Sequence, residues 1–196
     1  MGNRVVITGM GCISPVGNDI DAAWGNILNG KSGIGLVTHF DTTEYKTKIA
    51  AEVRGFDGEG QFGRREARRM DVVSQFALAA AIQAVENSGL KIDDSNRNRI
   101  GAVIGTGIGG IGTLFENMET LLTQGPNRVS PFLVPRMLPD TPGGMIAIHL
   151  GIQAINLAVV TACATGTNAL GEAAEMILRG QADIMLAGGT EAAIVP

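Results

Sequence analysis

The sequence has few aromatic residues and few charges. Aromatic residues make up 4% of the 196 positions and charged residues 17%, and the formal net charge is −4. A chain without a positive excess is a poor general binder of nucleic acid. Hydrophobic residues make up 45%, which is too many for a disordered chain. We therefore expect a folded protein with no nucleic-acid partner.

Long apolar runs and paired cysteines are also absent. No segment approaches the ~20 apolar residues that span a bilayer. The run Val5-Val6-Ile7 is too short for a signal peptide. The two cysteines, Cys12 and Cys163, form neither a CxxC pair nor a disulfide framework. The expected setting is a reducing cytoplasm, without membrane association.

Glycine, in contrast, is abundant. The chain has 28 glycines, about twice the usual share of roughly 7%. Such a composition suits close packing of backbones and tight turns near a site. Short β-rich runs alternate with longer helical patterns, which predicts an α/β fold: a mostly parallel sheet covered by helices on both faces.

The periodicity of apolar residues places the elements of this fold. Strands are expected at residues 4–8, 49–53, 99–105, 156–160 and 183–187. Helices are expected at residues 19–28, 64–87, 110–122 and 163–178. One more helix begins at Asp140, whose side chain is expected to cap it, and residues 125–139 form a proline-rich loop. The helix over 19–28 carries Ile20, Trp24, Ile27 and Leu28 on one face.

Cys163 lies where an apolar strand runs into a helix of small residues. The N-terminus of a helix carries partial positive charge and free N–H groups, which stabilise a thiolate and an oxyanion on a thioester carbonyl. The small side chain of Ala162 leaves room for a substrate chain. The residues alone support a buried structural cysteine equally well.

Two further patterns could indicate ligand sites. Gly105–Gly110 satisfies GxGxxG after a strand, but a dinucleotide fold needs an acidic residue ~20 positions later, where this chain has Ser130–Phe132. The only histidines, His39 and His149, lack metal-ligand spacing. We expect structural roles for both, and no metal or cofactor. An ionic or capping role is expected for Glu191.

The motifs together resemble the β-ketoacyl-acyl carrier protein synthases, and within them the elongating synthase II type. The resemblance covers essentially the whole chain. Its motifs are Val5–Gly9, Ser14–Gly17, His39–Asp41, Gly105–Gly110, Ser130–Phe132, Thr161–Cys163 and Ala187–Gly189. It implies a thiolase-like fold, of which residues 1–196 are the N-terminal half and the C-terminal half is absent.

The resemblance also implies an activity. In that family the cysteine accepts an acyl group from acyl carrier protein, and the carbanion from decarboxylated malonyl-acyl carrier protein then attacks the thioester. Two histidines, a lysine and a gating phenylalanine come from the second half. Cys163 would be the nucleophile here, with Gly107, Ile108, Leu133 and Ala162 lining the acyl site. Leu133 would reach across a homodimer.

The partner would be the acidic acyl carrier protein. The only dense basic cluster begins at Arg64, and Arg65, Arg68 and Arg69 are spaced to share one face of the expected helix. Family members use basic residues at these positions for the carrier.

Two other functions stay open. The 196 residues end soon after the last strand, as if cut from a larger protein, so they could be a non-catalytic dimerisation or binding fragment. A polyketide ketosynthase is the other alternative.

Overall fold

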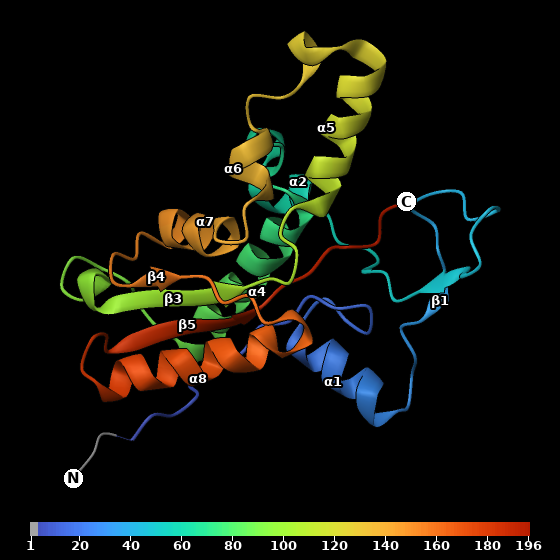
Figure 1. The fold of residues 1–196 in the computed structure, drawn as a ribbon. Coiled ribbons are helices and arrows are strands. Elements are labelled where there is room, and N and C mark those ends of the chain that lie inside the picture. The colour runs from blue at the N-terminus through green and yellow to red at the C-terminus, as the bar shows by residue number, and fades with distance from the viewer. Residues whose placement is uncertain (1–3) are drawn as a thin grey trace.

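A three-stranded parallel sheet forms the centre of the protein. The computed structural model, which describes residues 4–196, orders its strands β4-β3-β5 (Figure 1). They are β3 (Ile100–Gly105), β4 (Asn156–Leu157) and β5 (Ile184–Gly189). β3 and β5 pair along their whole length. β4 pairs over two residues only, so it is shorter than the expected strand at 156–160.

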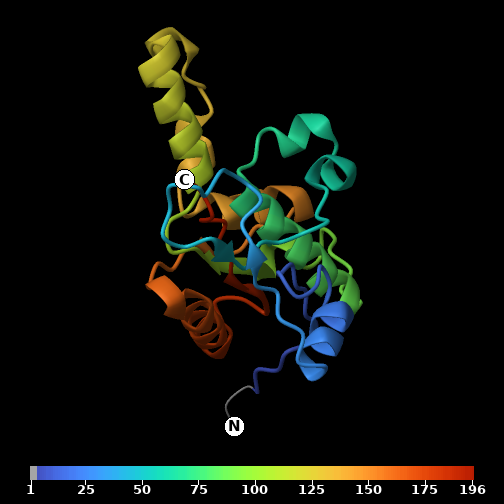
Figure 2. The same cartoon turned by 90° about the vertical axis from the view of Figure 1, so that its right-hand side faces the viewer.

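Helices cover both faces of this sheet. α4 (Val72–Ser88) and α7 (Thr141–Leu150) lie on one face, and α8 (Thr165–Leu178) lies on the other (Figures 1 and 2). Alternate side chains of β3 serve the two layers: Ile104 packs in the core with α4 and α7, and Val103 packs against α8. The predicted α/β fold, a parallel sheet between helices, is confirmed.

An ion pair joins the amino ends of β3 and β5. Arg99 donates to both carboxylate oxygens of Asp183, from Nε at 3.2 Å and from Nη2 at 2.8 Å. These hydrogen bonds hold the pKa of Asp183 below its ordinary value. The pair therefore lies at the amino end of the sheet, whereas the turns that lead into α5 (Ile111–Gln124) and α8 lie at its carboxyl end.

The expected strand at residues 4–8 is wrong. Val6 and Ile7 are exposed and pair with no described strand. The chain that follows lies along α4 instead. There the Cys12 N–H donates to Gln83 Oε1 at 2.9 Å, and a Cβ on Gly11 would lie 1.9 Å from a backbone oxygen of α4. Hydrophobic pattern predicts a strand but cannot supply the neighbouring strand that its backbone requires.

The expected single helix over residues 64–87 is broken. α2 (Gly58–Phe62) and α3 (Arg64–Ala67) precede a turn, and α4 begins only at residue 72. Asp71 accounts for the break. Its buried carboxylate accepts the N–H of Val73 at 3.0 Å, and the N–H and hydroxyl of Thr113 at 2.9 and 2.6 Å. Satisfying this carboxylate with three donors outweighs continuing the helix.

α1 (Ile20–Leu28) forms as expected, with Asp19 as its N-cap. Its predicted apolar face is not buried, since Trp24 is 59% exposed and Ala23 is the buried residue of the helix. A two-residue antiparallel pair follows, β1 (Gly35–Leu36) and β2 (Ile49–Ala50). β2 is therefore much shorter than the expected strand at 49–53.

An arm built from α5 (Ile111–Gln124) and α6 (Leu133–Met137) projects from the body (Figure 1). The segment 125–139, expected to be a loop, contains α6 and a 3₁₀ turn, because proline is well tolerated in the first turn of a helix. α7 begins as predicted, but Asp140 does not cap it. The backbone of Asp140 is itself helical, whereas a capping residue is normally extended.

No helix in the described part of the chain combines the length and the hydrophobicity needed to cross a membrane.

Candidate active site

Cys163 lies between β4 and α8, where the chain leaves the carboxyl end of the parallel sheet. It occupies a single 3₁₀ turn, η3 (Ala162–Ala164), which runs directly into α8. The α-helix begins at Thr165, two residues later than expected. Cys163 is exposed, so it is not a buried structural cysteine.

Ala162 gives this turn an unfavourable backbone conformation. Its φ is +50°, the only positive φ of a non-glycine residue between positions 4 and 196. An L-residue in this region costs roughly 1–2 kcal/mol. Such strain persists only where the surrounding structure fixes the backbone, and it clusters at functional turns.

Side-chain hydrogen bonds hold the turn. The Thr161 N–H donates to Thr165 Oγ1 at 2.9 Å, and Asn168 Nδ2 donates to Thr161 Oγ1 at 2.9 Å. The Cys163 N–H has no hydrogen-bond acceptor among the described residues. It lies beside the positive end of α8, where an anionic oxygen would be stabilised.

The glycine loop, residues 106–110, follows β3 and approaches the turn. A Cβ built on Gly107 would lie 3.9 Å from the Cα of Ala162. The Gly107 N–H donates to Glu191 Oε2 at 2.8 Å, and the Thr106 hydroxyl donates to Glu191 Oε1 at 3.1 Å. The Gly109 N–H donates in turn to Thr106 Oγ1 at 3.1 Å. Glu191 therefore anchors the glycine loop, and the expected ionic or capping role is not what the structure shows, because the N-cap of α5 is Gly110, which has no side-chain bond.

These bonds make the glycine loop a poor phosphate site. The N–H groups of Gly107 and Gly109 are engaged, and the Gly110 N–H donates to the Met137 carbonyl at 3.1 Å. A dinucleotide fold needs such N–H groups free to face the pyrophosphate. The carboxylate of Glu191 would also repel it.

The structure brings together most of the expected acyl-site residues. Cys163 and Ala162 are neighbours in the turn, and Gly107 faces them from the glycine loop. Ile108, the next residue of the loop, is 54% exposed. Leu133 has no described contact with the cysteine turn itself. It begins α6, which meets the glycine loop through its last residues: a Cβ on Gly110 would lie 2.3 Å from a backbone oxygen of α6.

An open groove of ≈590 Å³ runs beside the turn. One wall comes from the segment after β4, including Leu157 and Val159, and the other from α8, including Gly171. Thr161 and Asn168 line it as well, so the groove and the turn share a wall.

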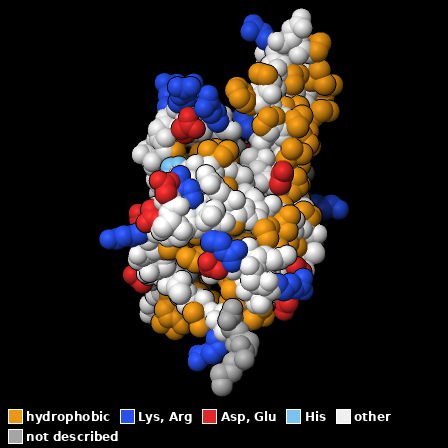
Figure 3. Space-filling view, turned by 90° about the vertical axis from the view of Figure 1, so that its left-hand side faces the viewer, with side chains coloured by type: hydrophobic (Ala, Val, Ile, Leu, Met, Phe, Trp, Pro, Cys, Tyr) orange, Lys and Arg blue, Asp and Glu red, His pale blue; other side chains and the backbone are white. Residues whose placement is uncertain are grey.

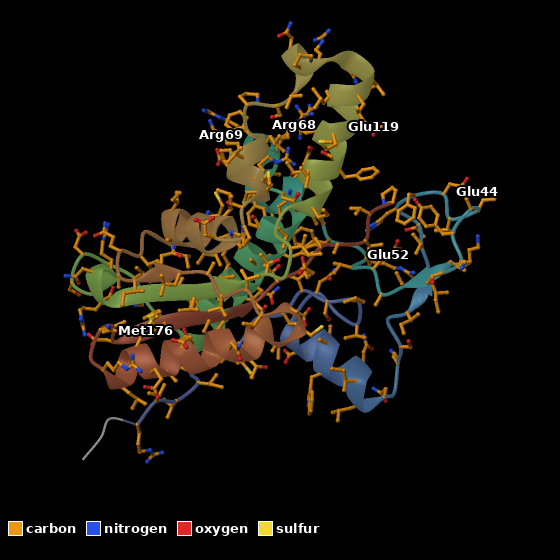
Figure 4. All side chains as sticks on the ribbon, in the orientation of Figure 1. Glu44, Glu52, Arg68, Arg69, Glu119 and Met176 are labelled. Carbon is orange, nitrogen blue, oxygen red and sulfur yellow. The ribbon has the colours of Figure 1, made fainter. Side chains whose placement is uncertain are left out.

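The three arginines expected to bind a partner lie on the other side of the sheet. Arg65 belongs to α3, and Arg68 and Arg69 to the turn after it, on the face of the sheet opposite α8 (Figures 1 and 4). Arg68 pairs with Glu59 at 3.9 Å and Arg69 with Glu66 at 3.3 Å. Since α3 ends before Arg68, the three do not share one helical face as expected. Figure 3 nevertheless shows basic side chains gathered over α2 and α3.

Both histidines have structural partners. His39 Nδ1 lies 3.9 Å from the buried carboxylate of Glu52. Glu52 also accepts the Thr38 N–H, and this hydrogen bond lowers the pKa of Glu52. His149 packs edge-on against Phe62, with ring centroids 6.4 Å apart. Across residues 4–196 no group of three or more histidine, cysteine or acidic side chains could hold a metal.

The apolar pattern and the motifs do not predict the polar residues that fix the site. Thr165 and Asn168 follow Thr161 by four and seven positions. Neither caps α8, whose N-cap Ala164 has no side-chain bond, so the usual capping signal does not identify them. Thr106 carries no such signal either, because its role depends on a carboxylate 85 positions away.

The chain matches the family model described as "Beta-ketoacyl synthase, N-terminal domain" over residues 2–196. It is 49% identical over 191 residues to 3-oxoacyl-[acyl-carrier-protein] synthase 2 of Staphylococcus aureus (strain N315), which covers 97% of this chain and 46% of that protein. The chain therefore spans just under half the length of this curated relative.

Two solved structures are similar as well. The ishigamide ketosynthase/chain length factor has a TM-score of 0.87 at 30% identity, covering 98% of this chain and 48% of that one. A ketosynthase from a type II PKS, in complex with its acyl-carrier protein and bound to the hexaketide, has a TM-score of 0.78 at 25% identity, covering 97% and 51%.

These likenesses define a thiolase-like ketosynthase fold that carries a cysteine at a strand-to-helix turn. The chain belongs to the β-ketoacyl synthase family.

Proposed function

We propose that this chain is the nucleophile-bearing half of a β-ketoacyl-acyl carrier protein synthase of fatty-acid elongation, and that Cys163 accepts the acyl group. The observation that carries the proposal is the exposed thiol of Cys163 in a strained turn directly before α8. The identity of 49% with a 3-oxoacyl-[acyl-carrier-protein] synthase 2 favours fatty-acid elongation over polyketide synthesis, because identity with the type II PKS ketosynthase is only 25%.

The proposed step is a thioester exchange. The Cys163 thiolate attacks the acyl carbonyl, whose oxygen becomes an oxyanion facing the Cys163 N–H. The bond from the carbonyl carbon to the carrier's sulfur then breaks, and the carrier leaves as a thiol after taking up the proton lost by Cys163. The acyl group remains on Cys163, and because the thioester is already activated, no cofactor is required.

Intact-mass measurement tests this step. We expect the chain to gain one acyl mass when incubated with a long-chain acyl-acyl carrier protein. Cys163→Ala removes the nucleophile and should abolish the gain, whereas Cys12→Ala should leave it unchanged. Acyl transfer that survives in Cys163→Ala would refute the proposal.

The isolated 196 residues should not complete a condensation. Decarboxylating malonyl-acyl carrier protein requires positioned acid–base groups, which typically supply ~10²–10⁴-fold in rate. His39 and His149 are engaged elsewhere, with Glu52 and Phe62. Clear β-ketoacyl product from the pure chain would contradict this part of the proposal.

Arg65, Arg68 and Arg69 are proposed to dock the acidic carrier. Their pairs with Glu59 and Glu66 are solvent-exposed and therefore weak, so the guanidinium groups remain free to attract another acidic surface. Replacing the three arginines with alanine should slow carrier-dependent acylation and flatten its salt dependence, since exposed charges act mainly through steering.

The matched control is acylation by a small carrier-free thioester, which the triple variant should leave nearly unchanged. If the triple substitution left the rate of carrier-dependent acylation unchanged at low salt, these arginines would not be the docking site.

A homodimer is proposed through the α5–α6 arm. Apolar side chains gather along α5 in Figure 3, and its exposed members include Phe115, Met118 and Leu122, the last of them 79% exposed. Apolar patches of this kind mark association surfaces. We expect concentration-dependent self-association in light scattering, reduced by Leu122→Glu. A monomer at every concentration would contradict it.

A non-catalytic binding fragment is the alternative function. It also predicts self-association and carrier binding, but it predicts no covalent acyl group on Cys163. The intact-mass measurement therefore separates the two.

A further inference from the structure

Glu191 has no part in the thioester exchange, yet its carboxylate is the acceptor for two donors of the glycine loop. It bonds the Gly107 N–H at 2.8 Å and the Thr106 hydroxyl at 3.1 Å, and that hydroxyl accepts the Gly109 N–H. One carboxylate and one buried hydroxyl thus fix residues 106–109. Hydrogen bonds to an ionised carboxylate are shorter and stronger than neutral ones.

The backbone beside Glu191 is itself anchored. The Thr190 N–H donates to the Gly105 carbonyl at 3.0 Å, and the Thr190 hydroxyl donates to the Val73 carbonyl of α4 at 2.8 Å. The carboxylate is therefore a fixed link between the end of β5 and the loop that follows β3.

No cation competes for this carboxylate, since Glu191 forms no ion pair with any described residue. Its two oxygens are thus committed to the loop. A surface glutamate with only a solubilising role would not need both oxygens aimed at backbone and hydroxyl donors.

The loop that Glu191 fixes packs against the cysteine turn. A Cβ on Gly107 would lie 2.8 Å from Glu191 Oε2 and 3.9 Å from the Ala162 Cα. The end of β5 approaches the first turn of α8 more closely, because a Cβ on Gly189 would lie 3.0 Å from the Gly166 Cα. Two close backbone approaches therefore connect the chain on either side of Cys163 to its surroundings, one to the glycine loop and one to the end of β5.

From these contacts we infer that Glu191 is a positioning residue. By holding Gly107, the residue before Ile108, against the turn, it sets the space available to an acyl chain beside the Cys163 thiol. The inference rests on the proposed acyl transfer for its biological meaning. Its physical content, the dependence of access to the thiol on Glu191, is independent of that transfer.

Two alkylating probes with the same reactive group test this dependence. Iodoacetamide reports the reactivity of the thiol, and N-dodecyl iodoacetamide also needs room for a chain. In Glu191→Ala we expect the long-probe rate at Cys163 to fall about tenfold relative to the short-probe rate, because small displacements at a reacting centre have large kinetic effects. Glu191→Gln keeps the shape and one acceptor oxygen, and should restore the ratio to within about threefold of wild type.

Glu44→Ala is the matched control, since it removes one exposed acidic charge from a loop remote from this site (Figure 4). It should leave the ratio unchanged. Thr106→Val and Thr106→Ser form a second pair, in which only valine loses the hydroxyl and should lower the ratio. Amide exchange at Gly107 should be slow in wild type and in Glu191→Gln, and fast in Glu191→Ala.

An unchanged long-to-short ratio in both Glu191→Ala and Thr106→Val, or rapid exchange of the Gly107 amide in wild type, would overturn the inference. Neither outcome depends on the carrier. Failure of acyl transfer with a normal alkylation ratio would instead count against the proposed function alone.

Discussion

The turns after β3 and β4 lie side by side and have opposite character. The loop after β3 is closed, because Glu191, Thr106 and a carbonyl of α6 accept its N–H groups. The turn after β4 is open, with an exposed thiol at Cys163 and an N–H that no described group accepts. Both turns leave the carboxyl end of a parallel strand and enter a helix. The two turns therefore differ because of a few side chains and not because of the fold. These side chains make the loop after β3 structural and leave the turn after β4 as a candidate reactive site.

Gly105→Ala should break this arrangement most severely, because Gly105 is where the two turns meet. A Cβ there would lie 2.2 Å from the carbonyl oxygen of Val159 and 2.2 Å from Thr165 Cγ2. We expect the free energy of unfolding to fall by about 3 kcal/mol, measured by urea denaturation.

Gly144→Ala is the matched control for this substitution. Gly144 is a half-buried glycine of α7, and apart from the nearby backbone of its own helix no described atom lies within 4 Å of its Cβ position. Alanine there should stabilise the protein by roughly 0.5–1 kcal/mol. Equal effects of the two substitutions would mean that the close approach at Gly105 is not real.

Ala162 tests the open turn in the same way. Valine tolerates a positive φ worse than alanine does, so Ala162→Val should lower the free energy of unfolding by about 2 kcal/mol. Ala162→Gly relieves the backbone strain but raises the conformational entropy of the unfolded chain. The two effects oppose each other, so the free energy of unfolding should change by less than about 0.5 kcal/mol.

Ala164→Val is the control for Ala162→Val, because Ala164 lies in the same exposed turn with φ −83°. It should have a smaller effect than Ala162→Val. If the two valine substitutions were equally costly, backbone strain at Ala162 would not explain the result.

Asp183 offers the smallest effect, at the other end of the same strands. Arg99 lowers the pKa of Asp183 below its ordinary 3.8. The ion pair therefore contributes fully at pH values above 3.8 and is lost as the pH falls through the lowered pKa of the folded state. Wild type should lose slightly more stability than Asp183→Asn between about pH 5 and about pH 2, without any change in Cys163 alkylation at neutral pH. Identical pH profiles would show that the pair adds nothing.

The sequence predicted the elements whose pattern is local. β3, α5 and the helix after Cys163 appear within a few residues of their expected positions, because each combines a clear apolar pattern with glycine or a cap at its ends. The cysteine turn followed from the same reasoning. Its strained residue, Ala162, did not, since φ depends on the packing of both flanking elements.

The failures share a different cause, which is contact between distant segments. The break at Asp71 depends on Thr113, 42 positions later, and the closed glycine loop depends on Glu191. The apolar run at residues 4–8 predicts a strand, yet no described strand pairs with it. Local pattern carries no information about such partners.

The reactivity of the two cysteines tests the open turn most directly. Cys163 is exposed at the start of a helix, whereas Cys12 is half-buried along α4. With limiting iodoacetamide and peptide mass mapping of the native chain, we expect Cys163 to be labelled at least about tenfold faster than Cys12. Equal labelling, or faster labelling of Cys12, would contradict the assignment of Cys163 as the reactive thiol.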